Sequence, residues 1–76
     1  MEAAIGLIEL TSSTKGFETC DAMLKAAGVE LVEAHPVCPG KYFILITGPL
    51  ASVEESVGKG IETSGDYLVY RLLIPN

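Results

Sequence analysis

The chain has 76 residues, which is room for a single domain spanning residues 1–76. Its net charge of −5 and five basic residues that form no cluster argue against a nucleic-acid partner. No apolar run approaches the roughly 20 residues that a membrane-spanning helix needs, so a membrane partner is not expected either.

Apolar residues make up 49% of the chain, more than a domain of this size can bury. The surplus predicts contacts between subunits. Met1-Glu2-Ala3 lacks the basic region of a signal peptide, and Glu9 interrupts the apolar run that follows. We therefore expect an obligate oligomer in the reducing cytosol, where Cys20 and Cys38 are thiols or metal ligands.

The first half of the chain predicts a strand followed by a helix. Residues 4–10 are mostly apolar and lead into Thr11-Ser12-Ser13-Thr14, a set of candidate helix caps. The spacing predicts a helix over residues 14–27 that ends at Gly28, since glycine enters the left-handed conformation without steric cost. The predicted buried stripe of this helix is Phe17, Cys20, Leu24 and Ala27.

Two further strands, residues 29–37 and 42–47, flank the tetrapeptide Cys38-Pro39-Gly40-Lys41. Proline followed by glycine suits the two central positions of a type II turn. The pattern therefore predicts a hairpin with Cys38 at the first corner of its tip.

A second helix is predicted to start at Gly48-Pro49, or later through a capping box of Ser52 and Glu55, and to end at Gly65. Residues 67–74 form the predicted last strand. The expected buried stripe of the second helix is Val53, Val57 and Ile61. Glu55 and Lys59 are spaced for an ion pair. Gly58 and Gly60 suggest close packing on their face of the helix.

The predicted order is β-α-β-β-α-β, the split βαβ arrangement of the α/β (α+β) class, with two helices covering an antiparallel sheet. This fold carries many unrelated functions, so the fold alone does not identify one.

Several segments carry a resemblance to a known family: residues 4–9, 21–27, 40–48 and 53–57, and Ile74-Pro75. Together they resemble the bacterial microcompartment (BMC) shell domain over residues 3–76, most specifically in Asp21-Ala22-Met23-Leu24-Lys25-Ala26-Ala27. The Cys-Pro-Gly-Lys tip resembles the first domain of the PduT-type tandem shell proteins of propanediol-utilising compartments.

The resemblance implies a structural shell subunit rather than an enzyme. Such proteins form hexagonal discs, or pseudohexagonal trimers of two-domain chains, that tile with other shell proteins into a wall. Carried over residue by residue, Cys38, Pro39, Gly40 and Lys41 would line a central pore that passes small metabolites or electrons. Lys25 and Asn76 would lie at the disc edge, where Asn76 replaces an arginine common in the family and predicts a weaker contact.

The resemblance also implies a 4Fe-4S cluster held on the symmetry axis by Cys38 from several subunits. The alternative is an incidental exposed thiol in a loop. A tandem protein brings three such cysteines to the axis, whereas a one-domain ring brings six, and three suit one cluster better. Cys20 is expected to be a small core residue without a function.

The remaining polar residues predict no catalytic site. His35 is the single histidine and is expected to be polar surface. Ser12, Ser13, Cys38 and His35 have no recognisable nucleophile–base arrangement. An alternative function, independent of the family, is a small-molecule-binding regulatory domain of the split βαβ type with its effector site between subunits.

Overall fold

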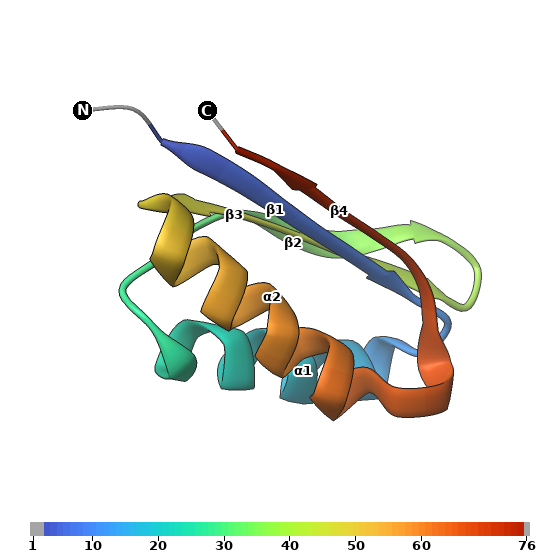
Figure 1. Cartoon of the computed structure of the whole chain (residues 1–76). Helices are drawn as coiled ribbons and strands as arrows, with labels where there is room; N and C mark the ends of the chain where they lie inside the picture. The colour runs from blue at the N-terminus through green and yellow to red at the C-terminus, as the bar shows by residue number, and fades with distance from the viewer. Residues whose placement is uncertain (1–2, 76) are drawn as a thin grey trace.

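Four strands form one antiparallel sheet in the order β2-β3-β1-β4, and two helices cover one of its faces (Figure 1). The computed structural model describes residues 3–75. The elements are β1 (Ala4–Leu10), α1 (Ser13–Ala26), β2 (Glu30–Cys38), β3 (Lys41–Gly48), α2 (Leu50–Ser64), a 3₁₀ turn (Gly65–Tyr67) and β4 (Leu68–Ile74). The predicted β-α-β-β-α-β order and fold class are confirmed.

The core lies between the sheet and the helices. Along β1 and β3 the even-numbered residues point to the helices and, except for Gly48 at the end of β3, are buried, as the two-residue period of a strand requires. Helix α1 packs mainly beneath β3 and β2, and α2 beneath β1 and β4. The fully buried apolar side chains are Ile8, Leu10, Met23, Ile44, Ile46 and Val53.

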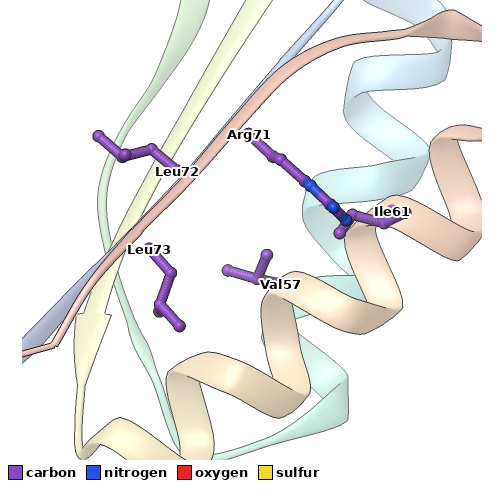
Figure 2. A pocket seen from close by; sticks show the side chains of 5 residues that line it. All are labelled: Val57, Ile61, Arg71, Leu72 and Leu73. Atoms are coloured by element: carbon purple, nitrogen blue, oxygen red, sulfur yellow. The ribbon is translucent and has the colours of Figure 1, made fainter.

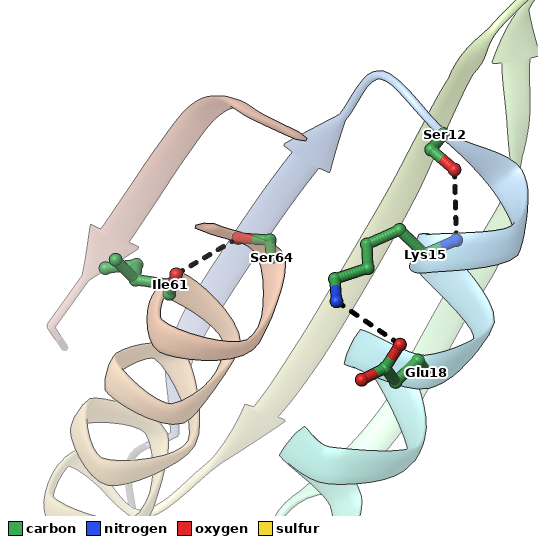
Figure 3. Close-up of polar contacts among 5 residues, drawn as sticks. All are labelled: Ser12, Lys15, Glu18, Ile61 and Ser64. Atoms are coloured by element: carbon green, nitrogen blue, oxygen red, sulfur yellow. Dashed lines mark hydrogen bonds and ion pairs between the residues drawn. The ribbon is translucent and has the colours of Figure 1, made fainter. Parts of the chain in front are cut away.

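Helix α1 begins where the sequence offered caps. The Ser12 hydroxyl oxygen accepts a hydrogen bond from the Lys15 backbone N–H at 3.1 Å, and the Lys15 ammonium pairs with Glu18 at 3.3 Å (Figure 3). The helix ends at Ala26, and Ala27 is already extended. The predicted left-handed stop at Gly28 is wrong, because the backbone leaves the helix through extended Ala27 and Gly28 has no positive φ.

The buried face of α1 differs from the predicted stripe. Gly16, Thr19 and Met23 are buried, whereas Phe17 is 63% and Leu24 37% exposed. The helix lies so close to β3 that a Cβ on Gly16 would overlap the Tyr42 ring. Gly16 and Thr19 thus face the sheet together with Met23, whereas Phe17 and Leu24 turn outward. Cys20 is partly buried and packs against the core.

Helix α2 begins at Leu50 with Pro49 as its cap residue, so the earlier of the two predicted starts is confirmed and the Ser52–Glu55 capping box is wrong. Extended Pro49 already positions the first turn, and Ser52 lies within the helix. The buried stripe is confirmed, with Val53 and Val57 buried and Ile61 partly buried.

The end of α2 is also as predicted. Gly65 has a φ of +55° and donates its N–H to the Ile61 carbonyl, to which the Ser64 hydroxyl also donates at 3.2 Å (Figure 3).

The expected Glu55–Lys59 pair is wrong, because the Lys59 ammonium lies 3.1 Å from Glu62 instead. Close packing occurs at Gly60 and not at Gly58.

Candidate functional site

The hairpin between β2 and β3 forms an exposed tip at one end of the sheet. Cys38 and Lys41 are the last paired residues of the two strands, and Gly40 has a φ of +79°. That value is the one a type II turn requires at its third position, so the predicted turn geometry is confirmed. Beside the tip, the Lys41 ammonium lies 3.9 Å from the Glu9 carboxylate on β1.

Each chain offers one exposed thiol at this tip. Cys38 is free and exposed, whereas Cys20 is partly buried on α1, where burial first and Asp21 second raise the pKa of its thiol. No group of three or more His, Cys, Asp or Glu side chains within residues 3–75 could hold a metal ion. A cluster therefore fits this chain only where several copies bring Cys38 together.

His35 lies on the sheet face away from the helices, above Phe43 of β3 with ring centroids 5.5 Å apart. Its Nδ1 lies 3.1 Å from the Pro36 carbonyl oxygen and its Nε2 2.8 Å from the Glu33 carboxylate. Both partners are acceptors, so the doubly protonated ring satisfies both. The hydrogen bond to Pro36, followed by that to Glu33, raises the pKa of His35. This is the polar surface position that the sequence predicted.

Lys25 is the last basic residue of α1, and its side chain is 76% exposed. Its ammonium lies 2.9 Å from Asp21, one turn earlier. The second predicted edge residue, Asn76, lies outside the described residues. The structure thus places Lys25 on the surface and leaves its edge contact a prediction.

The apolar surplus lies on the surface, as the composition indicated. The α1/β2 flank, defined here by α1 and the β2 edge, exposes Phe17, Leu24, Leu31, Val32 and Val37. The α2/β4 flank, defined by α2, the 3₁₀ turn and the β4 edge, exposes Leu50, Tyr67, Val69, Tyr70, Leu72 and Ile74. Two apolar flanks on opposite edges of one sheet are suited to contacts between subunits.

Sequence reasoning missed a pocket of about 300 Å³ on the α2/β4 flank. Val57 and Ile61 of α2 and Leu73 of β4 give it an apolar floor, and the Arg71 side chain reaches across toward Ile61 (Figure 2). The only signal in the sequence was a single arginine within the apolar run of the last strand.

Comparison with known proteins then identifies the family. The model of the BMC domain matches residues 4–76. The chain belongs to the BMC domain family. Within residues 3–75, no helix has the length and apolar character that a membrane crossing requires.

Several relatives are shell proteins by name. The chain is 43% identical over its whole length to the bacterial microcompartment shell protein PduT of Citrobacter freundii, of which it spans 41%. It is also 31% identical to the carboxysome shell protein CcmK3 of Halothece sp., of which it spans 78%.

The solved structures agree. A crystal structure of a microcompartment protein from Desulfitobacterium hafniense DCB superimposes with a TM-score of 0.97 and 46% identity. The match covers the whole of this chain and 42% of that one. The chain thus spans less than half the length of PduT and of the Desulfitobacterium protein. The resemblance to the BMC shell domain that the sequence indicated is confirmed.

Proposed function

We propose that this chain is a structural shell subunit of a bacterial microcompartment in the cytoplasm, and that it is not an enzyme. The observation that carries the proposal is the match of residues 4–76 to the BMC domain. The two exposed apolar flanks support it, because a small domain leaves so much apolar surface open only where partners cover it. Those partners are further copies of the chain and other shell proteins.

In this proposal the chains form a ring, a hexamer of single domains or a trimer if the domain belongs to a tandem protein. Cys38, Pro39, Gly40 and Lys41 line its pore, and Lys25 and Asn76 lie at its edge. The topology supports this arrangement. Helix α1 follows the end of β1 nearest the tip and runs back toward Gly48, so the tip and Lys25 lie at opposite ends of the sheet.

The pore proposal has two forms: the pore passes either small metabolites or electrons. We propose propanediol utilisation as the pathway inside the compartment. In the second form, Cys38 from several subunits holds a 4Fe-4S cluster on the axis. Iron–sulfur clusters take cysteine thiolates, and rotational symmetry can gather exposed thiols that one chain supplies singly. When bound, the cluster would supply one-electron transfer across the wall.

Anaerobic native mass spectrometry of fresh protein tests the proposal, because it reports ring size and bound mass together. We expect a ring with the added mass of one 4Fe-4S cluster, lost in Cys38→Ser and retained in the matched control Cys20→Ser. A ring without iron or acid-labile sulfide would overturn the cluster and leave the shell role. A discrete dimer that tightens with a metabolite would instead favour a regulatory domain.

A further inference from the structure

Phe17 is the most exposed of the large apolar side chains that the structure shows on its surface, at 63%. It lies on α1, on the α1/β2 flank. Its ring meets the buried Tyr42 ring edge to face, with centroids 5.3 Å apart and planes at 77°. Tyr42 therefore supports the Phe17 ring from below, and the ring projects from the surface in a defined direction.

Arg71, in the pocket on the other flank, differs from the other basic residues of the chain. The four lysines each have a carboxylate within 4.0 Å: Lys15 with Glu18, Lys25 with Asp21, Lys41 with Glu9 and Lys59 with Glu62. Within residues 3–75, Arg71 takes part in no ion pair or side-chain hydrogen bond. Its guanidinium thus lies over an apolar floor without a polar partner among the described residues.

These two features cannot meet within one molecule. Phe17 packs on β3, in the half of the sheet that α1 covers, whereas the pocket lies between α2 and β4 at the opposite edge. Both lie on the helix side of the sheet, since Arg71 pairs with Ile8, whose side chain points to the helices. Two copies placed side by side in the same orientation bring one feature to the other.

We propose that Phe17 of one copy inserts into the Val57–Ile61–Leu73 pocket of the next, with the Arg71 guanidinium against the face of the ring. This inference rests on the proposed ring. A cavity of about 150 Å³ holds a benzene ring, so a pocket of about 300 Å³ accommodates the phenyl group. A cation over an aromatic face is attracted by the ring quadrupole, which gives Arg71 a partner without a carboxylate.

The contact is heterologous, because the projecting residue and the pocket are different surfaces of the same chain. Such contacts join copies head to tail, and they close into a ring when the rotation between neighbours fits. Each copy in a closed ring would give one Phe17 and receive one. On the helix side of the sheet, the contact would cover Phe17 of one copy and the apolar floor of the pocket of the next.

A double-mutant cycle on the association constant, measured by sedimentation velocity, tests the contact. We expect Phe17→Ala and Arg71→Ala each to raise the dissociation constant by at least about 10-fold, as truncation of a central anchor does. The double variant should be only slightly weaker than the more affected single variant, because both remove one interaction. Lys59→Ala, which removes one exposed charge from α2, should leave association within about 2-fold.

Circular dichroism checks that each variant is folded, and Phe17→Leu, which retains packing on Tyr42, replaces Phe17→Ala if that variant unfolds. The contact would be overturned if either single substitution left the dissociation constant unchanged, or if the two fold-changes multiplied in the double variant. In either case, rings formed by the wild-type chain would leave the shell role intact. A wild-type chain that stays monomeric at all concentrations would overturn both.

Discussion

Thr19 on α1 and Ser56 on α2 are fully buried, and their hydroxyl groups differ in hydrogen bonding. The Ser56 hydroxyl donates to the Met23 carbonyl oxygen at 2.8 Å, whereas the Thr19 hydroxyl has no partner within residues 3–75. A buried hydroxyl without a hydrogen bond loses its solvation and gains nothing in return. The two residues therefore make opposite contributions to stability.

We predict that Thr19→Val raises the free energy of unfolding by about 1 kcal/mol, because it removes an unpaired polar atom at constant shape. The matched Ser56→Ala should lower it by about 1–3 kcal/mol, since it takes away the hydroxyl that donates to the Met23 carbonyl. Urea denaturation at equal protein concentration measures both. A Thr19→Val variant less stable than the wild type would contradict the account.

His35 should titrate above its ordinary pKa of 6.5, because the Pro36 carbonyl and the Glu33 carboxylate both favour the charged ring. Its stabilising effect is then fully present below the unfolded-state pKa and is lost as the pH rises through the higher folded-state pKa. NMR titration of the His35 ring in the wild type and in Glu33→Gln measures this. Glu33→Gln should lower the pKa; an equal or higher value in that variant would show that Glu33 does not stabilise the imidazolium.

Helix packing depends on where glycine is placed. A Cβ on Gly60 would lie 2.7 Å from the Met23 sulfur, whereas a Cβ on Gly58, on the same helix, would meet nothing within 4 Å. Helix α2 therefore packs against Met23 of α1 at Gly60, where there is no room for a Cβ, and not at Gly58.

We predict that Gly60→Ala destabilises the fold by about 1–3 kcal/mol through overpacking against Met23. Gly58→Ala should stabilise it by up to about 1 kcal/mol, because alanine favours an exposed helix position. Thermal denaturation of the two variants gives the comparison. Equal effects of both substitutions would mean that helix propensity alone, rather than the contact with Met23, sets the outcome.

The strands and the hairpin were predictable because their signals are local. Short apolar runs mark β1 and β3 as strands, and Pro39-Gly40 determines the turn, whereas the buried face of each strand follows from the packing of the helices. The buried face of α1 was not predictable from apolar spacing, because it depends on the Tyr42 ring packing against Gly16 from another element. The Arg71 pocket is formed by α2 and β4 together, so no local pattern indicates it.

In the whole molecule, the proposed pore tip and the proposed edge residue Lys25 lie at opposite ends of the domain. The tip with Cys38 lies at one end, and Lys25 lies at the other, highly exposed and paired with Asp21. In the proposed ring the pore and the disc edge therefore lie at opposite ends of the domain, so we expect that a substitution at the edge can leave the pore unchanged.

We predict that Lys25→Asp leaves rings intact and abolishes extended sheets, because it puts a negative charge beside Asp21 at the proposed edge between discs. Native mass spectrometry measures the ring, and electron microscopy the sheet. Lys15→Ala, also on α1, is the control and should form normal sheets. Sheets of normal order from Lys25→Asp would rule out the edge role.

The central claim is that this chain is a tile of a shell. Negative-stain electron microscopy of the wild-type chain at increasing concentration tests it most directly, because rings and their two-dimensional packing are visible in the same images. We expect discs with a central pore that associate into hexagonal sheets. Discrete particles without rotational symmetry, which never pack into sheets at any concentration, would contradict it.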